Sequence, residues 1–283
     1  CDPRHLCAAV ICFHQPAAAL GIGDCSIAVG PPDLLEFLLL DLVVDAGLLQ
    51  RRRSRCHGRY RTSVVLSVRP GYGVKPSVDA VAEALTYIER ESTLLRPINM
   101  PPGTPGRGAM FVEGRNGHRV LVVNALGRVF MPPVDDPFRA IEAAVAACPL
   151  GEQADAIIVD FHTEATSEIQ AMGVFLDGRV SLVVGTHTHI PTADHRILRG
   201  GTALMADAGM CGDFDSIIGT ESDEPLNRFL TGIPNGRFTP AEGEATLCGV
   251  AVETDPMTGL ARFVQPLRVG GTLSQALPDF PQV

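Results

Sequence analysis

The fold is decided by two stretches of sequence, AIIVDFHTE at residues 156–164 and SLVVGTHTH at residues 181–189. Each begins with an apolar run of strand-forming residues, 156–159 and 181–184, which is typical of a β-strand buried on both faces. Polar side chains follow at once in both stretches. Residues just beyond the ends of such strands line the crevice where α/β proteins place their ligands, so the pattern predicts an α/β fold with a site at this edge.

Three histidines follow these two strands. In an extended segment His187 and His189 point to the same side, which lets both imidazoles reach one metal cluster. His162 would supply a third nitrogen from the neighbouring strand. The alternative is that each histidine is an ordinary hydrogen-bonded loop residue. Three histidines at two strand ends, with Asp160 and Glu164 alongside, favour a metal site, and metal-dependent hydrolysis is the first functional hypothesis.

Composition limits the class of protein and the class of partner. The chain has 283 residues, of which 46% are hydrophobic, enough to bury the core of one large domain or of a domain with a small insert. Its formal net charge of -9 argues against wrapping polymeric nucleic acid, which needs clustered Lys and Arg to neutralise phosphates. A small anionic substrate remains compatible with this charge if a metal supplies positive charge locally.

No membrane span is expected. The most apolar segment, 34–49, is interrupted by three acidic residues, Glu36, Asp41 and Asp45. The first residues also lack the pattern of a signal peptide. The cysteines show no CxxC spacing, and the later ones are expected to be buried free thiols: Cys148, Cys211 and Cys248. These features favour a reducing, cytoplasmic location.

The secondary-structure signals after residue 80 predict a layered α/β or α+β sandwich. Segment 207–245 is long, acidic and rich in glycine, which predicts loops at an active-site rim or at an oligomer contact. Helices are expected at 82–90, at 137–148 with Asp136 as cap, and at 166–176 with Thr166 as cap. A strand is expected at 202–206. Two hairpins are expected, one pairing 111–112 with 120–123 and one pairing 248–252 with 261–264.

A series of ordered motifs fills the same part of the chain. They are LLRP at 94–97, PPGTPG at 101–106, GRVFM at 127–131, DDPF at 135–138, DFHTEATSE at 160–168, GTHTH at 185–189, TAD at 192–194 and DAGM at 207–210. In this order, from about Glu83 to the end, the chain closely resembles the bacterial YmdB-like metallophosphoesterases of the calcineurin-like superfamily.

The resemblance implies a four-layer αββα sandwich that holds two divalent or mixed-valence metal ions, iron or manganese. It implies hydrolysis of small phosphodiesters, such as 2′,3′-cyclic nucleotides, by a metal-bound hydroxide. Carried over residue by residue, His162 and His187 would bind one metal and His189 the other. Glu164 and Glu168 would orient histidine N–H groups or nearby backbone rather than bind metal.

Arg128 has two readings: contact with a substrate phosphate or a structural ion pair. The family also draws ligands and a general-acid histidine from its N-terminal half, and these motifs are not intact here. Asp24, in Gly23-Asp24, is the remaining candidate ligand. Ser77 stands where the histidine is expected, and a serine cannot donate a proton as an imidazole does at neutral pH.

Residues 1–80 differ in character from the remainder, residues 81–283, which we assign to the metallophosphoesterase domain. Translation of codons 75–80 one nucleotide later permits the family's Asn-His pattern, and the same shift at 50–57 permits another family-like stretch. We therefore expect 1–80 to be a degenerate or frame-shifted N-terminal half of what is one domain. If these residues are in the correct reading frame, the basic run at 51–55 is expected to be a solvated patch on the surface.

Three functional hypotheses follow from the sequence. The leading one is a metal-dependent phosphodiesterase acting on a small phosphate ester. A phosphomonoesterase or nucleotidase on the same scaffold is the alternative within enzymes. A catalytically inactive relative that serves as a binding or assembly module is the alternative outside them, because the N-terminal ligands are missing. A homo-oligomer is compatible with all three.

Overall fold

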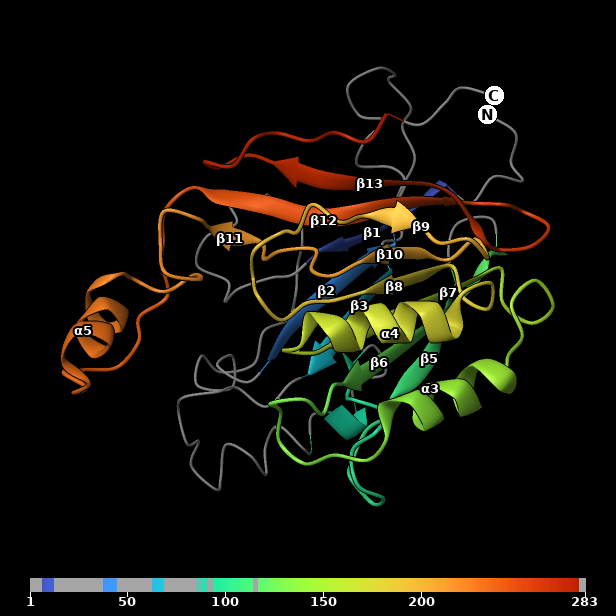
Figure 1. Cartoon of the computed structure of the whole chain (residues 1–283), viewed down its shortest axis with the longest axis horizontal. Helices are drawn as coiled ribbons and strands as arrows, with labels where there is room; N and C mark the ends of the chain where they lie inside the picture. The colour runs from blue at the N-terminus through green and yellow to red at the C-terminus, as the bar shows by residue number, and fades with distance from the viewer. Residues whose placement is uncertain are drawn as a thin grey trace.

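Two β-sheets lie face to face in the computed structural model, and two helices cover the outer face of one of them (Figure 1). The structure describes residues 7–12, 38–44, 63–68, 86, 88–90, 94–113 and 117–279. The described part therefore contains three of the four predicted layers, and the layered α/β architecture is confirmed.

The second sheet carries both stretches that decide the fold. Strands β6, β7, β8 and β10 run parallel, so their carboxyl ends meet at one edge. Every residue of β7 and of β8 is buried, as predicted for strands covered on both faces. The strands, in sheet order, are β5 (Ala109–Glu113), β6 (Arg119–Leu126), β7 (Ala156–His162), β8 (Leu182–Val184), β10 (Ala203–Met205) and β9 (Arg196–Ile197).

The first sheet joins strands from both ends of the chain. The β12–β13 hairpin pairs through β12 with β1, as well as with β11, and three strands come from the first 80 residues. In sheet order the strands are β13 (Ala261–Val269) beside β12 (Ala245–Thr254), with β11 (Gly212–Asp213) also against β12, then β1 (Cys7–Cys12), β2 (Leu38–Val44), β3 (Ser63–Val68) and β4 (Leu94–Leu95).

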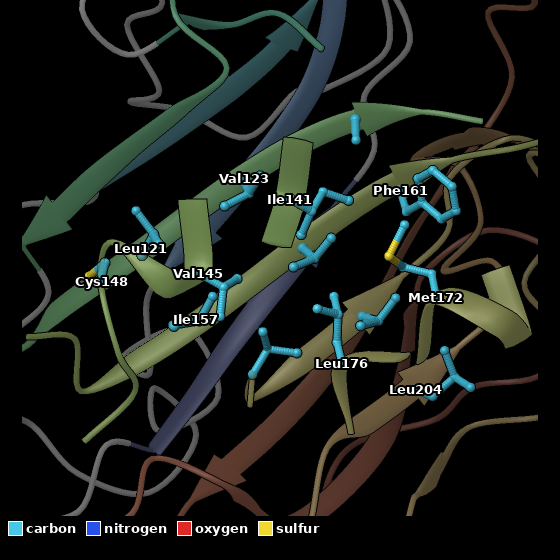
Figure 2. Close-up of a cluster of buried hydrophobic side chains, with 14 of the residues drawn as sticks. Leu121, Val123, Ile141, Val145, Cys148, Ile157, Phe161, Met172, Leu176 and Leu204 are labelled. Atoms are coloured by element: carbon cyan, nitrogen blue, oxygen red, sulfur yellow. The ribbon is translucent and has the colours of Figure 1, made fainter. Parts of the chain in front are cut away.

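Alternation along the strands of the second sheet separates two apolar layers. In β6, β7 and β8, even-numbered residues such as Ile158 face the first sheet and odd-numbered residues such as Ile157 face the helices, whereas in β10 the helix-facing residue is Leu204. Helix α3 (Pro137–Ala146) contributes Ile141, and α4 (Thr166–Leu176) contributes Met172, to this second layer (Figure 2). Truncation of a fully buried aliphatic side chain in such a layer costs about 2–5 kcal/mol.

The two helices begin in different ways. The carboxylate of Asp136 accepts hydrogen bonds from the backbone N–H groups of Phe138 and Arg139, which confirms the predicted cap before Pro137. Helix α4 spans the predicted residues, but the prediction of Thr166 as its cap is wrong. Thr166 is the first helical residue, and Ala165 precedes the helix without a side-chain hydrogen bond.

Both predicted hairpins are present as β5–β6 and β12–β13. The expectation of loops throughout 207–245 is wrong in part. The segment contains β11 and helix α5 (Asp223–Thr231), which stands apart from the sandwich at the left of Figure 1. The helix predicted at 82–90 is helical at residues 86 and 88–90, and its other residues lie outside the described part.

Cys148, Cys211 and Cys248 are buried free thiols, as predicted. Burial raises the pKa of the Cys248 thiol to about 12, so this thiol stays protonated and unreactive at neutral pH. Among the described residues, no helix is long and apolar enough to cross a membrane. The division of the chain at residue 80 stays a prediction.

Candidate metal centre

A buried polar cluster lies at the carboxyl ends of the parallel strands. Asn124 of β6 and Asp160 of β7 are register partners, and the Asn124 amide donates a hydrogen bond to Asp160 Oδ2 at 2.5 Å. The Thr186 hydroxyl, just after β8, donates to Asp160 Oδ1 at 2.9 Å. Asp160 therefore ties the ends of three strands together. It shares the inter-sheet face with His162 because the two are two residues apart along β7.

His162 and His187 come together above this cluster. Nε2 of His162 lies 2.9 Å from Nδ1 of His187, and the two rings meet edge to face with centroids 4.6 Å apart. On the outer side of the pair, His162 Nδ1 contacts the Thr186 carbonyl at 3.0 Å. His187 Nε2 contacts the carboxylate of Glu164. Each ring therefore has one nitrogen facing an oxygen and one facing the other ring.

These partners indicate where the ring protons lie. A carbonyl oxygen only accepts, so His162 Nδ1 carries its proton toward Thr186, and His187 Nε2 likewise donates to Glu164. In neutral rings the two inner nitrogens then face each other with lone pairs. Such a pair requires a proton or a cation between the rings. Neutral imidazoles are suitable ligands for a borderline divalent metal, so these two residues fit a metal ion.

His189 lies differently from the expectation. It has a left-handed backbone with φ of 65°, so the expectation that residues 187–189 are extended is wrong, while a shared metal cluster for His187 and His189 stays a prediction. His189 Nδ1 donates to the carbonyl of Ile218 at 3.0 Å. The neutral ring therefore keeps a lone pair on Nε2. Among the described residues, no group of three or more His, Cys, Asp or Glu side chains is arranged to hold a metal.

Asp207 holds the loop between the two histidines of GTHTH. Its side chain is buried, with 1% exposed, and its carboxylate accepts from the backbone N–H of Thr188 at 2.5 Å and of Gly209 at 2.8 Å. Gly209 has φ of 84°, and a Cβ there would lie 2.7 Å from the Pro191 ring. The turn after β10 therefore needs glycine, and Asp207 links this turn to the loop after β8.

Glu168 organises the loop after β6. Its carboxylate accepts from the backbone N–H groups of Arg128 and Val129 and from the Thr163 hydroxyl, at 2.9, 3.3 and 2.6 Å. This contact set matches the predicted role of orienting backbone, and the Glu164 contact matches that of orienting a histidine N–H. Both functional roles stay predictions. The Arg128 side chain is exposed.

Sequence reasoning did not identify Asn124, Thr186 and Asp207 as parts of the site. The signal was present in the sequence, since each is a polar residue at the end of an apolar strand, but their partners are 19 to 36 positions away. Asp24 and Ser77 lie outside the described residues. The candidate centre therefore consists of the His162–His187 pair, its carboxylate and carbonyl supports, and His189 beside it.

Comparison with known proteins identifies the family. The model of the YmdB-like protein family matches residues 79–267. A 2′,3′-cyclic-nucleotide 2′-phosphodiesterase of Bacillus subtilis is 46% identical over 187 residues, which cover 66% of this chain and 69% of that protein. A putative phosphatase/phosphodiesterase of Mycoplasma pneumoniae is 32% identical over 192 residues, with 65% and 66% covered. The matches thus span about two thirds of each relative.

Solved structures give the same grouping. A hypothetical protein of Thermus thermophilus is 40% identical, with a TM-score of 0.60 over 67% of this chain and 72% of that one. A structure described as a novel phosphatase of Mycoplasma pneumoniae is 31% identical, with a TM-score of 0.59 and 67% of each chain covered. Because the family model covers most of the chain and relatives of this identity share its fold, the chain belongs to the YmdB-like family.

Proposed function

We propose that this chain is a metal-dependent phosphoesterase that hydrolyses small phosphodiesters such as 2′,3′-cyclic nucleotides. The names of the relatives support a phosphoesterase. The observation that carries metal dependence is the contact between the inner nitrogens of His162 and His187, 2.9 Å apart, while oxygen atoms occupy both outer nitrogens.

In this proposal His162 and His187 hold one metal ion and His189 Nε2 serves a second, with iron or manganese as the metals. Bound metal ions of this kind acidify a water molecule and neutralise phosphoryl oxygens during hydrolysis. Glu164 keeps the His187 proton on Nε2 so that Nδ1 remains a ligand. Asp160, through Thr186, does the same for His162. Arg128 is the candidate contact for the substrate phosphate.

This proposal assigns no residue as the proton donor to the leaving group. Family members use a histidine at the position of Ser77, and Asp24 is the remaining candidate for an N-terminal ligand. An inactive relative that binds substrate or assembles without turnover is therefore the rival proposal. A phosphomonoesterase is the second enzymatic candidate, favoured by the phosphatase/phosphodiesterase description of the Mycoplasma relatives.

Metal content and hydrolysis of the purified full chain separate these proposals. We expect bound iron or manganese, and turnover of 2′,3′-cyclic AMP exceeding that of p-nitrophenyl phosphate. His187→Ala is expected to lower both metal content and activity. His118→Ala is the matched control, because His118 lies at the opposite end of β6, near Asp155 at 3.7 Å. Folded wild-type protein that takes up no metal and hydrolyses neither ester would support the inactive relative.

A second copy of the chain is the proposed partner of helix α5. Three apolar side chains of α5 lie at helical spacing and Ile233 follows just after the helix, and all four are 50% to 84% exposed: Leu226, Phe229, Leu230 and Ile233. Exposed Asp223 begins the helix and exposed Arg237 lies beyond its end. An antiparallel pair about a two-fold axis would therefore bury the apolar stripes and bring opposite charges together.

Light scattering after size-exclusion chromatography tests this partner. Phe229→Asp is expected to convert a dimer of the wild-type chain into a monomer, whereas Met257→Asp, at an apolar residue that is also 82% exposed, leaves the dimer intact. A monomeric wild-type chain would refute the proposal. We further propose a cytoplasmic location and no role on polymeric nucleic acid, supported by the net charge of -9 and the free thiols.

A further inference from the structure

Phe130 combines two unfavourable features. Its side chain is 87% exposed, although a phenyl ring gains free energy from burial. Its backbone is left-handed, with φ of 60°, a strained conformation that bulky residues rarely adopt. An exposed aromatic ring in a strained loop contributes little to folding. Strained residues cluster at active sites and ligand-binding loops.

The loop that presents Phe130 is tied directly to the candidate centre. The backbone N–H of Gly127 donates to the carbonyl of His162 at 2.7 Å. Glu168 holds the next two backbone N–H groups. A Cβ on Gly127 would lie 2.4 Å from the Thr163 hydroxyl, so this close approach of the loop to the end of β7 requires glycine. Since neighbouring Cα atoms are about 3.8 Å apart, the Phe130 Cα lies within about 11 Å of that of Gly127.

Backbone strain gathers around the same edge of the sheet. Among the described residues, three other than glycine have positive φ: Phe130, His189 and Ile218. The last two contact each other through the His189 ring and the Ile218 carbonyl. Ile218 is also 50% exposed. Among the described residues other than glycine, left-handed backbone therefore occurs on loops that contact the candidate centre or its neighbouring histidine.

We propose that Phe130 is the surface on which the base of a nucleoside cyclic phosphate stacks. This inference rests on the proposed phosphodiesterase function and specifies which part of the substrate the loop recognises. A phenyl ring with its face in solvent suits any nucleobase, because every base has a π-face. The loop is anchored to the backbone of His162 through Gly127, and in this proposal the cyclic phosphate of the stacked nucleotide lies at the candidate centre. Phe130 therefore selects for substrates that carry a base.

Paired substrates test this role. Wild type and variants are assayed with 2′,3′-cyclic AMP and with methyl riboside 2,3-cyclic phosphate, which lacks the base. Phe130→Ala is expected to raise the KM for cyclic AMP about 10-fold, as loss of one base stack predicts, and to change the kcat/KM of the base-free ester less than twofold. Phe130→Trp restores the wild-type KM. Phe130→Leu keeps apolar area without a ring and behaves like Phe130→Ala.

Equilibrium binding tests the role of Phe130 even if the protein has no phosphodiesterase activity. Calorimetry compares the binding of 3′-AMP with that of methyl riboside 3-phosphate, which lacks the base. Base-dependent binding that is lost in Phe130→Ala supports the role of Phe130 even where hydrolysis fails. Equal losses for both ligands, no loss for 3′-AMP, or a changed oligomeric state in Phe130→Ala would each overturn it. Met257→Ala is the control, because Met257 lies in the β12–β13 turn beside Gly151, before the start of β7 and away from its carboxyl end.

Discussion

Nε2 of His162 lies 2.9 Å from Nδ1 of His187, while the outer nitrogens of both rings face oxygen atoms from Thr186 and Glu164. The two rings are presented by different parallel strands, so the contact depends on the register of β7 with β8. The supports make the inner nitrogens acceptors. This relationship gives the site its capacity for a cation.

Replacing Glu164 with Gln removes the charged acceptor of the His187 Nε2 proton. We expect metal affinity to fall about 10- to 100-fold, because residues that orient a metal-bound histidine contribute at this level. Titration of the metal-free protein with Mn²⁺ measures the affinity. Glu152→Gln, at an exposed carboxylate near the start of β7, is the matched control. Unchanged affinity in Glu164→Gln would show that the contact does not orient a ligand.

Asp207→Asn changes a buried group that only accepts hydrogen bonds from backbone. The new amide would turn an N–H group toward the backbone N–H of Thr188 or Gly209. We expect a loss of about 1–3 kcal/mol in the free energy of unfolding, measured in urea. Activity should fall as well, since this carboxylate holds the loop between His187 and His189. Asp279→Asn, at an exposed residue that lies in neither proposed site, should leave both quantities nearly unchanged.

Gly127→Ala tests the tight junction between the β6 loop and the histidine strand. The added Cβ would lie 2.4 Å from Thr163 Oγ1 and 2.5 Å from Glu168 Oε2. We expect about 1–3 kcal/mol of destabilisation from overpacking. In contrast, Gly236→Ala should be tolerated, because the nearest atom to its Cβ is 3.9 Å away. Equal unfolding midpoints for the two variants would contradict the described geometry.

Asp194 should make the fold sensitive to acid. Burial raises the pKa of this carboxyl, but hydrogen bonds from Thr192, the Ala206 backbone and Gln170 together hold the pKa below its ordinary value of 3.8. The folded pKa is then lower than the unfolded one. The stabilisation is therefore present above about pH 4 and is lost as the pH falls through the folded pKa.

Urea unfolding of wild type and Asp194→Asn between pH 6 and pH 2.5 measures this effect. We expect the wild type to be the more stable protein at pH 6 and the difference to shrink below about pH 4. A difference that stays constant with pH would show that ionisation of Asp194 does not stabilise the fold. The carboxylate is partly exposed, with 30% of its side-chain surface accessible, so solvent reduces the size of the effect.

Much of the fold could be predicted because its signals are local. The apolar runs at 156–159 and 181–184 predicted buried strands, and Asp136 before Pro137 predicted the start of α3. Helix α5 was missed because its apolar stripe faces outward, in a segment whose acidic and glycine residues indicate loops. Thr166 had the right chemistry for a cap, but the backbone became helical one residue before it was expected to.

The candidate site was also predicted only in part. The sequence by itself determined that His162, His187 and His189 follow the ends of strands, because strand formation depends on neighbouring side chains. Only the tertiary structure decided that two of these rings meet, that His189 turns to Ile218, and that Phe130 stands exposed on the β6 loop. These relationships depend on strand register, on left-handed backbone and on contacts between residues far apart in sequence, none of which a local pattern encodes.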